Sequence, residues 1–162
     1  MTSKQSDLVY AGFWQRFGAS FLDGILLYLV MFALLLLAYG TSYLDDPAAN
    51  WGFAQVLISY GLPITLTLIF WIKKAATPGK MAIGATIVDA HTGEQPTTRQ
   101  FVIRYFAYIV STLPLFLGYL WVVFDSRKQA WHDKLAGTVV VRRKDGASDP
   151  VRFEKPQATP MS

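Results

Sequence analysis

The sequence contains no cysteine and few charged residues. With no cysteine in 162 residues, disulfide bonds, thiol chemistry and cysteine-ligated zinc are excluded. Only 16% of the residues are Asp, Glu, Lys or Arg, which is low for a soluble protein, whereas 52% are hydrophobic. The length is that of one domain. The composition therefore predicts a single domain more apolar than soluble domains are.

Charged side chains are missing from three long stretches, 24–44, 47–72 and 105–124. Each is long enough to cross a bilayer core of about 30 Å, which needs about 20 apolar helical residues. The stretches also lack the polar stripe of a soluble core helix. A cleaved signal peptide is not expected at the N-terminus, because the apolar run 17–39 is longer than a signal peptide's and Asp23 interrupts it. We therefore predict membrane spans at 17–39 and 52–72, the second with Trp51 and Trp71 at headgroup level.

The third apolar region, 101–124, allows two interpretations because Pro114 lies near its centre and breaks or kinks a helix. It is either one kinked span or two half-helices that fold back as a re-entrant hairpin. Lys and Arg are absent from 40–51, number four in 73–100 and number eight in 125–162. The positive-inside rule puts the last two segments and the N-terminus in the cytoplasm of a cell-membrane protein, which favours the hairpin.

Two short β-branched segments, 82–90 and 137–143, are typical of strands. A lone strand is marginal, so we expect them to pair as a two-strand ribbon at the cytoplasmic surface. Thr97 and Gln100 have the spacing of a capping box and should begin the third helical region. The predicted fold is therefore all-α and transmembrane, with two full spans, a Pro-broken third region and this ribbon. A lead-in of residues 1–7 and a disordered cytoplasmic tail of residues 144–162 flank the membrane domain, 8–143.

Two oppositely charged residues of the first span are candidates for function. Arg16 and Asp23 are seven positions apart, on one helix face with Ser20 between them. Direct contact requires Arg16 to reach along the helix, and Arg104 is an alternative partner for Asp23. A carboxylate in an apolar span is costly unless it is paired or hydrated. The pair is either an ion or proton site that titrates at Asp23, or a structural ion pair near the interface.

A second charged cluster follows the third region and contains Asp125, Arg127, His132, Asp133 and Lys134. We expect this segment to form a short amphipathic helix with its cations toward anionic lipid headgroups. His132 beside Asp133 would suit a proton relay, but no second His has the spacing of a metal ligand, so neither a metal nor another cofactor is expected.

The segment 77–80, Thr-Pro-Gly-Lys, lacks the first glycine and the final Ser or Thr of a phosphate-binding loop and is expected to be a turn. The net charge of +4 comes mainly from the predicted cytoplasmic side. Contact with anionic lipid at the membrane surface explains this positive charge better than binding of nucleic acid does.

Three stretches together, 12–23, 77–89 and 124–141, resemble the RDD family of bacterial membrane proteins in order and spacing. The family takes its name from one arginine and two aspartates. Arg16 and Asp23 match the first two, and Asp133 is our choice for the second aspartate, with Asp125 as the alternative. The resemblance implies an integral membrane protein of unassigned molecular function, for which transport of a small ion or solute, including cation/proton exchange, is the usual suggestion.

Three hypotheses about function follow. In the first, a small transporter uses the intramembrane Arg and Asp residues and assembles as a homo-oligomer or with another membrane protein, because two spans enclose little pathway. In the second, the chain is a membrane scaffold in which those residues are structural. The third, a lipid-directed enzyme, ranks last because no nucleophile or metal constellation supports it, and we expect no enzyme activity.

Overall fold

The structure is a computed structural model that describes residues 8–46 and 52–143. Predictions for the lead-in 1–7, for Trp51 and for the tail 144–162 lie outside these residues. The first predicted span is helix α1 (Phe13–Tyr39). It begins four residues earlier than expected, at a cap where the backbone N–H of Gly12 donates to Gln15 Oε1 at 3.1 Å. Arg16 therefore lies in the first turn of α1.

The second span is one apolar run, Phe53–Lys74, made of α3 (Phe53–Val56), the π-helical turn η1 (Leu57–Gly61) and α4 (Leu62–Lys74). The π turn ends two residues before Pro63, which has no backbone N–H to donate to the helix. Of the described helices, α1 and this run are the two long and apolar enough to cross a membrane, by length and composition. The short helix α2 (Ser42–Asp45) follows α1. Both predicted spans are therefore matched by helices of sufficient length and apolar character.

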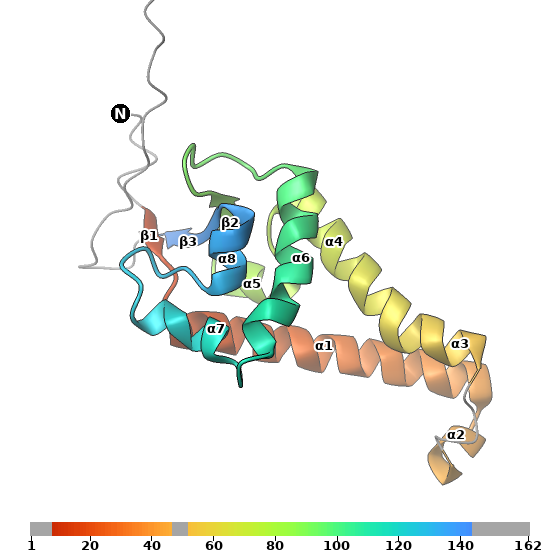
Figure 1. The fold of residues 1–162 in the computed structure, drawn as a ribbon. Helices are drawn as coiled ribbons and strands as arrows, with labels where there is room; N and C mark the ends of the chain where they lie inside the picture. The colour runs from red at the N-terminus through yellow and green to blue at the C-terminus, as the bar shows by residue number, and fades with distance from the viewer. Residues whose placement is uncertain (1–7, 47–51, 144–162) are drawn as a thin grey trace, which may run out of the picture.

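The predicted break in the third region is confirmed. Helix α6 (Thr98–Thr112) and the segment Leu117–Val123, made of α7 (Leu117–Leu120) and η2 (Trp121–Val123), are bent by 111°. The predicted capping box begins α6, since the N–H of Gln100 donates to Thr97 Oγ1 at 3.3 Å and the N–H of Thr97 donates to Gln100 Oε1 at 2.8 Å. In Figure 1, α6 runs across the direction of α1 and α7 turns back along α1.

Helix α7 packs closely against α6 at Gly118, just after the bend between the two helices. A Cβ added to Gly118 on α7 would lie 2.5 Å from Ser111 Cα on α6. Atoms cannot approach so closely without a shift of the backbone, so a glycine is needed there. The bend therefore combines a proline that ends α6 with a glycine that lets α7 return against it.

The sheet has three strands in the order β1-β3-β2 and is antiparallel. The predicted pairing of 82–90 with 137–143 is confirmed between β2 (Ala85–Asp89) and β3 (Thr138–Arg143), where Ile87 lies opposite Val140. The predicted two-strand ribbon is wrong in number, because β1 (Leu8–Tyr10) adds to the other edge of β3. Three residues are too few to show a period in sequence. The centre of β3 is fully buried.

Two short helices lie between the sheet and the long helices (Figure 1). Helix α5 (Pro78–Ala82) packs on α1, and α8 (Trp131–Ala136) packs on α6 just before β3. Trp71 is buried in the core, with its ring centroid 5.9 Å from that of Phe101, and its expected place at headgroup level stays a prediction. The first turn of α1, helix α8 and the N-terminal half of α6 thus lie close together beside the sheet.

Candidate functional site

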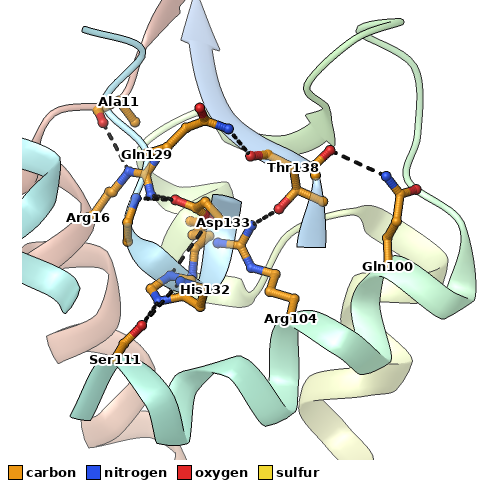
Figure 2. A network of polar contacts seen from close by, with 12 residues as sticks. Ala11, Arg16, Gln100, Arg104, Ser111, Gln129, His132, Asp133 and Thr138 are labelled. Atoms are coloured by element: carbon orange, nitrogen blue, oxygen red, sulfur yellow. Dashed lines mark hydrogen bonds and ion pairs between the residues drawn. The ribbon is translucent and has the colours of Figure 1, made fainter. Parts of the chain in front are cut away.

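Asp133 is the centre of a buried charge cluster (Figure 2). It lies on α8 and is completely buried. Its Oδ2 accepts from Arg16 Nη1 and from the N–H of Ala130 at 3.0 Å, while Arg104 Nη1 lies 2.6 Å from Oδ1. Because Ala130 is the residue before α8, the same carboxylate caps its own helix. One side chain therefore holds α1, α6 and α8 together.

Each arginine of the cluster has a second anchor. Arg16 Nε donates to the carbonyl of Ala11 at 3.0 Å. Arg104 Nη1 donates to Thr138 Oγ1 on β3 at 2.8 Å, and its guanidinium lies 5.3 Å from the centroid of the Trp71 ring. The two guanidinium groups hold the pKa of the Asp133 carboxyl well below its usual range, although burial alone would raise it. Asp133 is therefore a fixed charge at physiological pH.

His132 is neutral. Burial lowers its pKa to about 3, and the nearby Asp133 opposes this only in part. Ser111 Oγ accepts the backbone N–H of His132 at 3.1 Å and lies 3.1 Å from His132 Nδ1. Since the hydroxyl already accepts one bond, its hydrogen can go to Nδ1, which leaves the imidazole hydrogen on Nε2, 3.7 Å from Asp133 Oδ1. A proton relay through this imidazole near neutral pH is therefore disfavoured.

Asp23, about two helical turns beyond Arg16, has different partners from those expected. Its Oδ1 accepts the backbone N–H of Gly79 at 2.6 Å and its Oδ2 accepts the hydroxyl of Thr77 at 2.5 Å. Among the described residues both arginines that were proposed as partners go to Asp133 instead. The reason is that α5 brings hydrogen-bond donors directly onto the Asp23 carboxylate. Asp23 thereby holds the start of α5 on α1.

The segment Thr77–Lys80, expected to be a turn, begins α5 with Pro78 in its first turn. A Cβ on Gly79 would overlap the backbone carbonyl oxygen of Ala19, so a glycine is needed for this close approach. Lys80 follows and is 6% exposed, with its Nζ 3.4 Å from Thr77 Oγ1. Burial lowers the pKa of its ammonium below the usual value. Sequence reasoning missed Lys80 as a site residue because it resembled an exposed turn lysine.

A cavity of about 390 Å³ adjoins the cluster. Its lining comes from α1, α5, α6, the α7 region and α8, and consists of Phe13, Arg16, Phe17, Ser20, Lys80, Arg104, Tyr108, Phe116, Tyr119, Leu120, Val122, Ala130 and His132. Three of these side chains are cationic, and among the described residues that line the cavity there is no Asp or Glu. The candidate residue Ser20 also lies here. The structure therefore brings Arg16, Ser20, Arg104 and His132 to one cavity, whereas Asp23 is not part of its lining.

The other candidate aspartate, Asp125, lies outside this cluster. It pairs with Lys134, and its Oδ2 accepts the N–H groups of Arg127 and Gln129 at 3.1 and 3.0 Å. Of the two possible second aspartates, Asp133 is thus the one that contacts Arg16.

The predicted short helix is present as α8, and its contact with anionic lipid headgroups stays a prediction. The side chain of its cation, Lys134, is 44% exposed. His132 and Asp133 are buried, however, and the apolar Leu135 is 56% exposed. Within residues 8–46 and 52–143, no group of three or more His, Cys, Asp or Glu side chains is placed to hold a metal ion.

Comparisons with known proteins give the family of the chain but not its activity. Two curated relatives are both uncharacterized proteins. RP437 from Rickettsia prowazekii (strain Madrid E) is 44% identical over 75 residues, which cover 46% of this chain and 41% of that protein. YxaI from Bacillus subtilis (strain 168) is 29% identical over 81% of this chain and 96% of its own length. No solved structure matches. A family model described as "RDD family" matches residues 10–137, most of the sequence, and the chain therefore belongs to the RDD family.

Proposed function

We propose that the chain is a multi-pass protein of the cell membrane that binds a small charged solute in the 390 Å³ cavity as the binding step of transport. The observation that carries the proposal is the charge of this cavity. Arg16, Lys80 and Arg104 all line it. Asp133 pairs with both arginines, whereas the buried Lys80 contacts only the Thr77 hydroxyl among the interactions of the described residues. Buried charges of this kind are costly and are typical of sites for charged ligands.

The proposal places the sheet and the cavity on the cytoplasmic side. Strand β1 precedes α1, β2 follows α4 and β3 follows the bent pair, yet the three strands form one sheet. Two crossings, by α1 and by the run Phe53–Lys74, return the chain to the side on which it began. The bent third region begins and ends at the same sheet, which supports a re-entrant hairpin over a third span. The many Lys and Arg residues of 73–100 and 125–162 favour the cytoplasm.

The Arg and Asp residues that name the family have a structural role in this proposal. Asp133 joins three helices, and both oxygens of Asp23 accept bonds from α5. These contacts also favour the scaffold hypothesis. We combine the two: the aspartates hold the cavity in shape, and Lys80 and the free N–H groups of the arginines face the solute. Two membrane-spanning helices from one chain are too few to surround a pathway for a solute. We therefore propose that the transporting form is a homo-oligomer.

Reconstituted protein is expected to dissipate a gradient of at least one of four probes, sodium, potassium, inorganic phosphate or benzoate. Flux is read in proteoliposomes with isotopes, relative to protein-free liposomes. If phosphate or benzoate is the probe that moves, Lys80→Gln should reduce its flux at least tenfold, because the substitution removes a cation from the cavity wall. The matched control is Lys74→Gln at the end of α4, where the lysine is exposed. Absence of flux for all four probes, with correctly assembled protein, would contradict transport and leave the scaffold function.

A further inference from the structure

We propose that the ligand of the cavity is an amphiphilic anion, a phosphate or carboxylate group on an apolar chain, whose head binds between Arg16, Lys80 and Arg104. This inference rests on the proposed function for the existence of a ligand, and goes beyond it in naming the sign of its charge and its apolar part. Head and chain are each supported by separate features of the cavity.

Unsatisfied hydrogen-bond donors support the oxyanion head. Arg16 Nη2 and Arg104 Nε are buried without a hydrogen-bond partner among the described residues. The remaining cation, Lys80, has a 3.4 Å contact with the Thr77 hydroxyl. Buried donors are normally paired, and leaving one unpaired is costly. An oxygen anion could accept from all three side chains, and such charge-assisted bonds are the stronger kind.

The charge balance of the region also favours an anion. Around the cavity the charged groups that act on Lys80 and His132 are three cations, Arg16, Lys80 and Arg104, and two carboxylates, Asp23 and Asp133. With His132 neutral and Lys80 in its protonated form, three positive and two negative formal charges leave +1. Burial lowers the pKa of Lys80, and an anion beside it would favour the protonated form. A bound cation would raise this buried excess, whereas a monoanionic head would cancel it.

The remaining lining supports the apolar chain. Away from the cations the wall consists mainly of aromatic and aliphatic side chains from α1 and the α7 region, such as Phe13, Phe17, Phe116 and Leu120. Phe17 and Phe116 are 56% and 60% exposed, on the apolar outer surface that would face lipid. A ligand with an apolar chain would therefore pass from the lipid phase into the cavity without crossing polar surface. A volume of about 390 Å³ is at the small end for ligand sites, enough for the head and the first part of a chain.

The test measures equilibrium binding to the full chain in nanodiscs of zwitterionic lipid. Radiolabelled dodecyl phosphate is the probe, and the competitors are dodecanoate, inorganic phosphate, dodecyltrimethylammonium and phosphatidic acid. We expect saturable binding of the probe, competition by dodecanoate, and at least 100-fold weaker competition by inorganic phosphate and by dodecyltrimethylammonium. Lys80→Gln should weaken binding at least tenfold, and Lys74→Gln should leave it unchanged.

Each outcome bears on the proposal. Equal competition by dodecyltrimethylammonium would overturn the anionic head, and equal competition by inorganic phosphate would overturn the apolar chain. Both comparisons use the unmodified protein, so they hold even if Lys80→Gln fails to fold. Displacement by phosphatidic acid supports the proposal and identifies a membrane lipid as the source, whereas displacement by dodecanoate alone supports a single-chain amphiphile. Binding without flux would contradict transport but not this ligand, and flux without binding of the probe would contradict this ligand alone.

Discussion

Asp133→Asn is expected to prevent stable folding of the protein. The substitution keeps the size of the side chain but removes the negative charge that Arg16 and Arg104 share in a fully buried place. Removing one partner of a buried ion pair costs about 3–5 kcal/mol, because the other charges stay buried without compensation. A domain has only about 5–15 kcal/mol of stability to lose. The measurement is thermal unfolding of purified protein in detergent, with the yield of monodisperse protein as a second readout.

Asp125→Asn is the matched control. Asp125 pairs with Lys134, whose side chain is 44% exposed, and an asparagine oxygen can still accept from the N–H groups of Arg127 and Gln129. The Asp125 side chain is 10% exposed but its partner reaches solvent, so the loss should be about 1 kcal/mol or less, well below that of Asp133→Asn. Similar unfolding temperatures for the two variants would contradict the role assigned to Asp133.

Gly79→Ala is expected to separate α5 from α1. The new Cβ would overlap the carbonyl oxygen of Ala19 and lie 3.0 Å from Asp23 Cγ, and neither belongs to a flexible end of a side chain. Overpacking of this kind costs roughly 1–3 kcal/mol, and the hydrogen bond from the Gly79 N–H to Asp23 would be strained as well. Because Lys80 is the next residue, binding of an anion in the cavity should weaken together with stability. Thermal unfolding and the dodecyl phosphate assay measure the two effects.

The control for Gly79→Ala is Gly24→Ala on α1. No heavy atom lies within 4 Å of the position that its Cβ would take. Alanine is better than glycine in a helix by roughly 0.5–1 kcal/mol, so this variant should be at least as stable as the unmodified protein. If Gly79→Ala were tolerated as well as Gly24→Ala, the close packing of α5 on α1 would be wrong.

The parts of the fold that could be predicted from the sequence are those with local signals. Charge-free runs predicted the spans, Pro114 predicted the break, and Thr97 and Gln100 predicted the start of α6. Each of these depends on residues close together along the chain. Strand β1 was missed because three residues are too few to show the alternation of apolar and polar side chains that marks a strand. It also pairs with β3, which lies near the other end of the chain.

The site depended on contacts that no local signal reveals. Arg16 and Asp133 are 117 positions apart, and α8 buries Asp133 while the neighbouring Lys134 stays exposed, a difference that the sequence around them does not indicate. The resemblance to the family singled out both residues without pairing them. Lys80 was missed because its burial arises from the approach of α5 to α1, which is a property of Gly79 and Ala19 in space.

The central claim is that the third helical region turns back, so that the sheet, the charge cluster and the cavity all lie on the cytoplasmic face. Single cysteines test it cleanly because the chain has none of its own. Asp45→Cys, Glu94→Cys and Arg143→Cys replace exposed residues of α2, the β2–α6 connection and the end of β3. With a membrane-impermeant maleimide, intact cells should label position 45 alone, and positions 94 and 143 only after permeabilisation. Labelling of position 143 in intact cells together with position 45 would show that the third region crosses the membrane, and would contradict the account.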